Sequence, residues 1–576
     1  MEMVRLIIDG RSVEVPQGST ILQAAKAAGV EIPTLCYHPD QKVKANCRVC
    51  VVEVEGSRVL QPACAYPVAR NMVVHTATPK VREARRTVVE LLLSHHPQDC
   101  LQCDRNLKCE LQSLSQKLGV RELPFEPELR NLPIDESSVA IVRDPNKCIN
   151  CGRCVEACHD VQGVGVLYAT GRGYDTVVAP SLNKPLAEVP CVLCGQCIQA
   201  CPVGAIIERD DTSLVWTALS DPKKHVIVQT APAIRVAIGE ELGMGTGSLV
   251  TGKLVAALRR LGFAKVFDTD FTADLTIMEE GHELLERLAH GGRLPMITSC
   301  SPGWINYIEH YYPELLDHLS TCKSPQQMFG ALAKTYYAEK MGIDPAQIVV
   351  VSVMPCTAKK YEAHRTEMNS SGQRDVDVVL TTRELGKMLR EAGIDFTRLH
   401  EETFDEPLGI STGAGVIFGA TGGVMEAALR TVHEVVTGKE LPGVDFAPVR
   451  GMNGVKQASA DLDGLEVRVA VAHGLQNAKQ VLEAIKAGNT DYHFIEIMSC
   501  PGGCIGGGGQ PIGTTNQVRQ QRMAAIYAED RTMPLRKSHD NPAVQALYSE
   551  FLGQPLGERS HHLLHTHYEP KSKYPR

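Results

Sequence analysis

The chain has 576 residues, too many for one ordinary domain, and its 43% hydrophobic and 22% charged residues are typical of a globular protein with a substantial core. Its net charge of −8 and the lack of a long basic run argue against a nucleic-acid partner. The N-terminus has no apolar signal core, and no run of about 18 apolar residues is present, so we expect a cytoplasmic protein without a membrane span.

The 20 cysteines are concentrated in the first part of the chain. Fifteen precede residue 202, none lies between residues 202 and 299, and five follow. Because the cytosol keeps thiols reduced, this distribution favours metal binding over disulfides.

The first 78 residues predict a small domain rich in strands. The segment VRLIIDGRSVEV alternates around an Asp-Gly turn and predicts a hairpin, and STILQAAKAAGV predicts a helix that begins at a capping serine. Four cysteines follow, and their number and spacing suit a 2Fe–2S cluster, with zinc as the alternative. They are Cys36, Cys47, Cys50 and Cys64.

A helical stretch within residues 79–118 contains one histidine and three cysteines at ligand spacing. Three thiolates and one imidazole suit a tetrahedral zinc ion as well as an iron–sulfur cluster. These residues are His96, Cys100, Cys103 and Cys109.

Residues 148–158 and 191–202 both contain the run C-x2-C-x2-C-x3-C, which is typical of bacterial two-cluster ferredoxins. In such pairs the fourth cysteine of each run binds the other cluster. One predicted 4Fe–4S site is therefore Cys148, Cys151, Cys154 and Cys201. The other is Cys191, Cys194, Cys197 and Cys158.

From about residue 223 the pattern predicts an α/β domain. Apolar strand-like runs such as HVIVQTA, QIVVVSVMPC and HFIEIMSC alternate with helical segments, which indicates parallel strands covered by helices on both faces. Cys356 and Cys500 each end such a run, and Cys300 follows LPMITS. We expect these thiols at the carboxyl ends of strands, where ligands usually bind in this class of fold.

Two further segments are rich in glycine, and they lead to different predictions. MSCPGGCIGGGGQP at 498–511 combines two cysteines with six glycines, which predicts a loop that lets the backbone approach a large inorganic group. GMGTG at 243–247 lacks the strand–loop–helix context of a nucleotide site and is predicted to be a loop.

The segment ADLTIMEEGHELLERLAH predicts a helix with an apolar stripe. Glu280 lies at the edge of this stripe, with Glu283 and Arg287 progressively outside it. By geometry alone, a solvated face with a Glu283–Arg287 pair is the better interpretation.

Three segments together resemble the signature segments of the iron-only (FeFe) hydrogenases. They are ITSCSPGW (297–304), MPCTAKKYE (354–362) and EIMSCPGGCIGGGGQP (496–511). The segment at 538–568 is similar to the small-subunit segment of the same family, so the resemblance covers nearly the whole chain.

The resemblance implies an H-cluster, a cubane 4Fe–4S joined by a cysteine sulfur to a two-iron unit with CO, cyanide and a dithiolate. By motif position, Cys356, Cys500 and Cys504 are cubane ligands and Cys504 is the bridge. Lys359 matches the position that hydrogen-bonds cyanide. The matching pocket-lining positions are Met354, Met498, Gln326 and Pro232.

The resemblance also implies a proton path and reverses the interpretation of the helix above. The matching proton-transfer positions are Cys300, Glu280, Ser320, Glu283 and Arg287. A partly buried Glu280 beside Glu283 is expected to have a raised pKa, which helps proton exchange near neutrality.

The chain departs from the family pattern at one position. Two adjacent cysteines are usual before Pro-Gly-Trp, one as proton relay and the next as cubane ligand, whereas this chain has Cys300–Ser301. By register Cys300 is the relay, but it is also a candidate cubane ligand, and the sequence leaves both roles open. Cys322 has no partner at ligand spacing and is predicted to be a buried, inert thiol.

The predicted fold is a modular α/β chain. Its expected parts are a β-grasp 2Fe–2S domain at 1–78, a histidine-ligated 4Fe–4S domain at 79–118, a two-cluster ferredoxin domain at 139–210, a two-lobed hydrogenase domain with parallel sheets at 223–530, and a small-subunit-like tail at 531–576. The expected cofactors are one 2Fe–2S cluster, three accessory 4Fe–4S clusters and the H-cluster.

The predicted function is reversible conversion of protons and electrons into H2. The N-terminal array resembles the electron-input arms of NADH- and formate-linked complexes. This implies flavin/NAD(P)-binding and small iron–sulfur partner subunits and an NAD(P)-linked, electron-bifurcating enzyme. The alternatives are a free-standing hydrogenase that exchanges electrons with ferredoxin, and a non-catalytic sensor, assembly or electron-transfer protein related to the hydrogenases.

Overall fold

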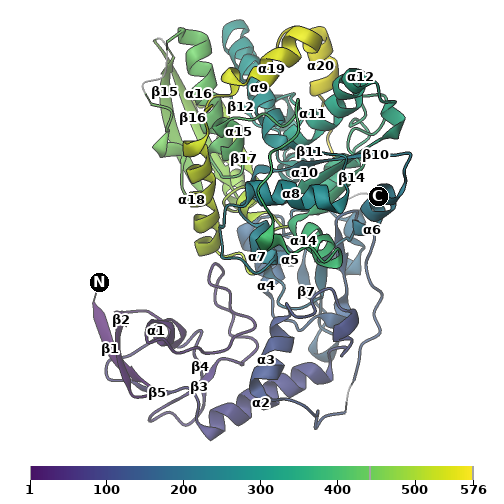
Figure 1. The fold of residues 1–576 in the computed structure, drawn as a ribbon. Coiled ribbons are helices and arrows are strands. Elements are labelled where there is room, and N and C mark those ends of the chain that lie inside the picture. The colour runs from purple at the N-terminus through teal and green to yellow at the C-terminus, as the bar shows by residue number, and fades with distance from the viewer. Residues whose placement is uncertain (1, 127, 440–442, 463, 574–576) are drawn as a thin grey trace.

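The computed structural model describes residues 2–126, 128–439, 443–462 and 464–573. In Figure 1 the N-terminal sheet and helix α2 lie at one end, and the elements from residue 212 onwards form the larger body at the other. The short elements of residues 141–208 lie between these two ends (Figure 1).

The N-terminal part is a five-stranded sheet in the order β2-β1-β5-β3-β4. Its strands are β1 (Met3–Ile8), β2 (Arg11–Pro16), β3 (Val51–Val54), β4 (Gln61–Pro62) and β5 (Val73–His75). The predicted hairpin is confirmed, with Asp9 and Gly10 at φ of 46° and 78° in its turn. Helix α1 (Ile21–Ala27) begins one residue later than predicted, because Thr20 and Gln23 form a reciprocal capping box.

The middle of the chain contains short elements around the cysteine runs. Helices α2 (Pro79–Ser94) and α3 (Glu110–Leu118) pack against each other. Strand β6 (Ile141–Arg143) pairs with β9 (Ile206–Glu208), and β7 (Tyr168–Thr170) pairs with β8 (Val177–Ala179). The short helices α4 (Arg153–Glu156) and α5 (Gln196–Ala200) each begin within a cysteine run.

Two four-stranded sheets organise the larger body. The first has the order β11-β10-β13-β14 and is entirely parallel; its strands are β10 (His225–Thr230), β11 (Lys265–Asp268), β13 (Ile348–Met354) and β14 (Val378–Thr381). The second has the order β12-β17-β16-β15; its strands are β12 (Met296–Ile297), β15 (Val455–Leu462), β16 (Leu465–His473) and β17 (Phe494–Met498). The predicted parallel strands are confirmed, and β15 adds an antiparallel edge that the apolar pattern did not indicate.

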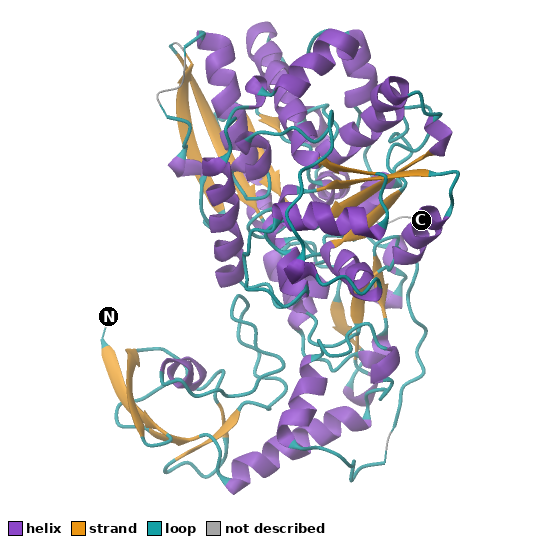
Figure 2. Cartoon of the chain, in the orientation of Figure 1, coloured by secondary structure: helices purple, strands orange, loops and turns teal. Residues whose placement is uncertain are grey.

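Helices pack against both sheets, and one side of the β15 edge stays uncovered (Figure 2). Those of the larger body are α6 (Thr212–Ser220), α7 (Ile238–Glu241), α8 (Thr251–Leu261), α9 (Thr269–His290), α10 (Pro302–Tyr311), α11 (Pro325–Leu332), α12 (Ala338–Met341), α13 (Ala358–Ala363), α14 (Thr382–Glu391), α15 (Gly413–Ile417), α16 (Gly423–Thr437), α17 (Leu475–Lys486), α18 (Asn516–Thr532), α19 (Pro542–Leu547) and α20 (Glu558–Leu564). Helix α9 contacts α11, α15, α16 and α19, so most of its first four turns is buried. Residues 243–247 form a loop between α7 and α8, as predicted.

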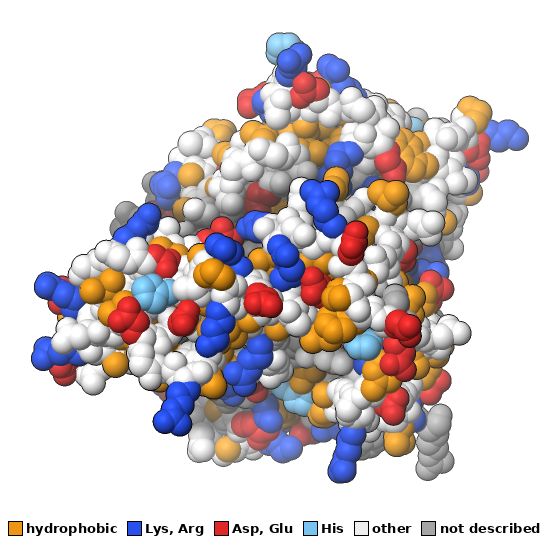
Figure 3. Space-filling model, turned by 90° about the horizontal axis from the view of Figure 1, so that it is seen from below, with side chains coloured by type: hydrophobic (Ala, Val, Ile, Leu, Met, Phe, Trp, Pro, Cys, Tyr) orange, Lys and Arg blue, Asp and Glu red, His pale blue; other side chains and the backbone are white. Residues whose placement is uncertain are grey.

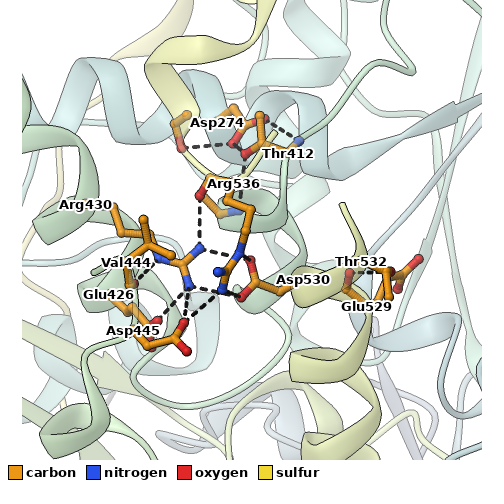
Figure 4. Close-up of polar contacts among 12 residues, drawn as sticks. Asp274, Thr412, Glu426, Arg430, Val444, Asp445, Glu529, Asp530, Thr532 and Arg536 are labelled. Carbon is orange, nitrogen blue, oxygen red and sulfur yellow. Dashed lines mark hydrogen bonds and ion pairs between the residues drawn. The ribbon is translucent and has the colours of Figure 1, made fainter. Parts of the chain in front are cut away.

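Buried ion pairs attach the C-terminal helices to the body (Figure 4). Arg430 on α16 is fully buried and donates to Glu426 at 2.7 Å and to both carboxylate oxygens of Asp530 on α18 at 2.9 and 3.0 Å. On α9, Asp274 accepts from the amide and hydroxyl of Thr412 at 3.0 and 2.7 Å. These contacts fix α16 to α18, and α9 to the N-terminus of α15.

The surface shows mixed charge. On the face seen from the end that carries the N-terminal sheet (Figure 3), basic and acidic side chains are interspersed with hydrophobic ones. Within the described part of the chain, no helix combines the length and apolar character needed to cross a bilayer.

Candidate active site and cluster sites

Four cysteines from distant segments line one cavity at the carboxyl ends of strands. Cys356 follows β13, Cys500 follows β17, Cys300 follows β12, and Cys504 lies in the glycine-rich loop. All four border the same cavity. The position at strand ends agrees with the expectation for this class of fold.

The remaining walls of the cavity are mostly apolar. Of the residues predicted to surround a cofactor, five line it: Pro232, Gln326, Met354, Lys359 and Met498. The Lys359 ammonium donates to the carbonyl of Cys300 at 3.1 Å and to the Glu362 carboxylate at 2.9 and 3.1 Å. Glu362 was missed from the sequence, although its i+3 spacing from Lys359 in MPCTAKKYE is a signal that it orients the lysine.

The donor set fits a soft, positively charged inorganic group. Burial, and then the Cys356 thiol, raise the pKa of Cys504 to about 12, and the same two causes raise the pKa of Cys500. Such thiols do not ionise alone in an apolar cavity, whereas iron binding removes their protons. Within the described part of the chain, the buried Oε1 of Gln326 also has no hydrogen-bond partner. The chemistry of these residues therefore fits an iron–sulfur cofactor.

The glycine-rich loop lines the cavity and also packs closely against other segments of the chain. Gly503 and Gly507 line the cavity, but a Cβ on Gly507 would lie 2.1 Å from the carbonyl oxygen of Pro355. A Cβ on Gly508 would lie 2.3 Å from the carbonyl oxygen of Cys194. Besides the predicted approach to a large inorganic group, these glycines let the loop pack against the β13 loop and the second cysteine run.

The predicted proton-transfer residues form a buried group next to the cavity. Glu280 is 2% exposed and Glu283 is 7% exposed, so the solvated-face interpretation is wrong for both. Glu283 accepts from Arg287 at 2.6 Å and from the Ser320 hydroxyl at 3.0 Å. Burial, and then the charge of Glu283, raise the pKa of Glu280 to about 8, in the expected direction. Burial and then Glu280 raise the pKa of Cys300.

Cys300 and Ser301 both line the cavity, but their contacts differ. The Ser301 hydroxyl donates to the Ser499 hydroxyl at 3.2 Å and accepts from the Ser499 amide at 3.2 Å. Its oxygen is therefore engaged by protein groups, whereas the Cys300 thiol lies where the charges of Glu280, Lys359 and Cys504 act on it.

The ferredoxin-like cysteines gather in two groups. One cavity is lined by Cys148, Cys151, Cys154 and Cys201. A second is lined by Cys158, Cys191, Cys194 and Cys197. These are the two crossed sets that the spacing predicts. After burial, thiols of both sets raise the pKa of Cys197, so the sets are neighbours.

The N-terminal cysteines also lie in pairs. The Cys47 amide donates to Cys36 Sγ at 3.5 Å, and Cys50 interacts with Cys64. His96 is buried and its Nδ1 has no hydrogen-bond partner among the residues that the structure describes, so this nitrogen can act as a ligand.

The groups follow one another from the large cavity towards the N-terminus. Cys500 Sγ lies 4.0 Å from the carbonyl oxygen of Cys194. On the other side of the two crossed sets, two glycines lie close to the N-terminal segments. A Cβ built on Gly204 would lie 2.7 Å from Cys103 Sγ, and a Cβ built on Gly152 would lie 3.4 Å from the Lys44 side chain. Both N-terminal groups therefore meet the same part of the ferredoxin-like region.

Family models match successive parts of the chain. The C-terminal domain of the iron-only hydrogenase large subunit matches residues 224–508, and the iron hydrogenase small subunit matches 516–571. A 2Fe–2S iron–sulfur cluster binding domain matches residues 1–79, an NADH-ubiquinone oxidoreductase-G iron–sulfur binding region matches 85–124, and a 4Fe–4S dicluster domain matches 147–205. A relative from Solidesulfovibrio fructosivorans, named NADP-reducing hydrogenase subunit HndD, is 54% identical over 99% of both chains.

The chain is an iron-only hydrogenase. Iron hydrogenase 1 of Clostridium pasteurianum is 41% identical to it over 98% of this chain and 100% of the relative. The solved structure of an apo FeFe hydrogenase from Chlamydomonas reinhardtii is 46% identical, with a TM-score of 0.58 over 63% of this chain and 100% of that chain.

The resemblance drawn from the three motifs is thus confirmed, as is the modular α/β architecture. This hydrogenase is an enzyme of H2 catalysis and electron transfer that carries iron–sulfur cofactors. The comparisons favour the enzyme over a non-catalytic relative.

Proposed function

We propose that this hydrogenase interconverts H2 with protons and electrons (2H+ + 2e− ⇌ H2) at an H-cluster held by Cys356, Cys500 and Cys504. The observation that carries the proposal is the convergence of these three thiols on one cavity. When bound, the cluster supplies the redox-active irons at which protons and electrons combine.

The cavity side chains orient the cofactor and exclude water. Lys359, fixed by Glu362 and by the Cys300 carbonyl, presents an ammonium donor for cyanide. The apolar side chains of Pro232, Met354 and Met498 keep the cavity dry, and Gln326 supplies a polar contact.

A proton path from the cavity to solvent runs through Cys300, Glu280, Ser320, Glu283 and Arg287. It is supported by the decreasing burial from Glu280 to Arg287 and by the hydrogen bonds that join Ser320 and Arg287 to Glu283. With a pKa of about 8, Glu280 takes up and releases protons near neutrality.

Cys300 acts in this proposal as the proton relay and not as a cubane ligand. Replacement of Cys300 by alanine separates the two roles. An intact EPR signal of the cubane with stalled turnover is expected; loss of that signal would make Cys300 a ligand.

The accessory clusters carry electrons between the cavity and the surface. We assign a 2Fe–2S cluster to a domain at 1–78, a histidine-ligated 4Fe–4S cluster to 79–118, and two 4Fe–4S clusters to 139–210, ahead of a catalytic domain at 223–530 and a tail at 531–576. The cysteine groups described above support this division, and iron and sulfide analysis of the matured protein tests it: 14 accessory irons are expected from one 2Fe–2S and three 4Fe–4S clusters.

The proposed partners are a flavin/NAD(P)-binding subunit and a small iron–sulfur subunit. The relative named NADP-reducing hydrogenase subunit, which matches along the whole chain, supports this assembly. The runner-up is a free-standing enzyme that uses ferredoxin, because Iron hydrogenase 1 also matches along the whole chain.

Anaerobic purification of the chain from its source cells tests the assembly. Copurification of flavin-containing and iron–sulfur subunits, with NAD(P)-dependent H2 turnover that the isolated chain lacks, is expected. A lone chain with full NAD(P)-coupled activity, or one that exchanges electrons only with ferredoxin, would contradict it.

A further inference from the structure

Cys322 and His565 lie opposite each other although they are 243 positions apart in the sequence. They form an isolated antiparallel bridge between the segment after Ser320 and the C-terminal segment. Flanking hydrogen bonds from the Lys323 amide to the Leu564 carbonyl, at 2.8 Å, and from the Thr566 amide to the Thr321 carbonyl, at 2.7 Å, fix this register. Side chains of directly opposed residues in such a pair lie close together.

Glu283 of α9 completes a group of three buried metal-binding side chains. One ligand atom each from Glu283, Cys322 and His565 lies within 4.8 Å of the other two. Cys322 Sγ is 3.8 Å from Glu283 Oε2. Thiol, imidazole and carboxylate are the ligand types that zinc combines.

The spacing is close to that of a tetrahedral zinc site. With Zn–S at about 2.3 Å and Zn–O at about 2.0 Å, a tetrahedral angle separates sulfur from oxygen by about 3.5 Å. The observed 3.8 Å needs a closure of only a few tenths of an ångström.

A second observation concerns the Nε2 side of the His565 ring. His565 Nε2 lies 3.1 Å from Glu279 Oε2, and this carboxylate is held by the Tyr548 hydroxyl at 2.5 Å and by the Leu556 amide at 3.0 Å. A carboxylate behind an imidazole fixes the ring and its tautomer, as it does behind histidines that bind zinc. Nδ1 then carries the lone pair, which accepts from the Thr321 hydroxyl at 2.7 Å.

Local charge favours a cation. Glu279 and Glu283 are both buried within about one turn of α9, and the described basic partners of the group are Arg287 and His565. A divalent ion would offset this density of carboxylates.

We propose that Glu283, Cys322 and His565 form a zinc site, and that zinc bound there blocks proton transfer through Glu283. Coordination releases the Cys322 thiol proton to solvent and occupies Glu283 Oε2, the oxygen that accepts from Ser320 at 3.0 Å. The blocking effect rests on the proposed proton path, whereas zinc binding does not.

The test uses the matured enzyme with its full complement of iron, treated anaerobically with zinc sulfate and then desalted. Bound zinc is measured by elemental analysis and zinc K-edge absorption, and H2 evolution is assayed with a chemical reductant. The wild type is expected to retain one more equivalent of zinc than Cys322→Ala, with a Zn–S distance of about 2.3 Å. The zinc concentration that halves turnover is expected to rise at least tenfold in Cys322→Ala, whose basal turnover stays at the wild-type level.

Tyr548→Phe is the matched control, because it removes a hydrogen bond to Glu279 but none of the three ligands. It is expected to retain the extra zinc. His565→Gln, which keeps a donor towards Glu279, is a second ligand variant for use if Cys322→Ala fails to fold. Equal zinc in the wild type and the ligand variants, or a spectrum without the sulfur contribution, would overturn the site. Extra zinc with unimpaired turnover would instead overturn the blocking effect and the relay role of Glu283.

Discussion

Glu280 is the residue at which the proton path is most open to measurement. Burial and Glu283 raise its pKa from the usual 4.5 to about 8, which corresponds to about 5 kcal/mol in favour of the protonated carboxyl. At pH 7 about nine in ten Glu280 side chains then carry a proton, and at pH 9 about one in ten does. H2 evolution by the wild type is expected to decline as the pH rises through about 8, because the protonated donor is lost.

Replacement of Glu280 by glutamine keeps the shape of the side chain and removes its titration. Positioned acid–base groups contribute about 100-fold to 10,000-fold to rate, so turnover is expected to fall at least about 100-fold. The decline near pH 8 is expected to disappear from what remains. The assay is the pH profile of H2 evolution by protein with full iron content and an unchanged EPR signal of its clusters.

Glu279→Gln is the matched control, since the two glutamates are adjacent on α9 and both are buried. Glu279 contacts Tyr548, Ser560 and His565, none of which is in the proposed path. Its variant is expected to keep both the turnover and the decline near pH 8. Wild-type turnover in Glu280→Gln, or an unchanged pH profile, would refute the assignment of Glu280.

Two further variants test the packing that supports the site. Arg430→Met removes one of the two arginines that bind the buried carboxylate of Asp530, the other being Arg536, and is expected to cost about 1.5–3 kcal/mol, seen as a lower midpoint of thermal unfolding. Arg468→Met, at a side chain 45% exposed, is expected to change little. Gly508→Ala places a Cβ 2.3 Å from a main-chain oxygen of the second cysteine run and is expected to reduce the iron bound per chain; Gly245→Ala, whose Cβ has no neighbour closer than 3.8 Å, is the control. Unchanged stability in Arg430→Met, or wild-type iron content in Gly508→Ala, would contradict the corresponding argument.

The spacing of cysteines and the runs of apolar residues along the sequence were enough to predict much of the fold and of the candidate site. Cysteine runs predict ligand sets directly, because a cluster needs its thiols at short, fixed separations. Apolar runs predicted the parallel strands because strands covered on both faces must be apolar throughout. The position of Cys356 and Cys500 at the ends of such runs then placed both at one edge of the body.

Contacts between distant segments could not be predicted in the same way. The pairing of His565 with Glu279, and of Arg430 with Asp530, depends on how helices far apart in the sequence pack. In the sequence, nothing distinguishes Glu279 from an ordinary polar residue of α9. Its burial depends on contact with α20. The glycine-rich loop likewise gives no sign in the sequence that its close neighbours include Cys194 and Pro355.

The central claim is that Cys356, Cys500 and Cys504 hold one organometallic cofactor in a shared cavity. Infrared spectroscopy tests it most directly, on wild-type protein and on Cys504→Ala after maturation with the two-iron unit. The wild type is expected to show bands of bound CO and cyanide that shift under H2, and the variant is expected to lack them. Absence of these bands from the wild type, or an unaltered spectrum in Cys504→Ala, would contradict the account.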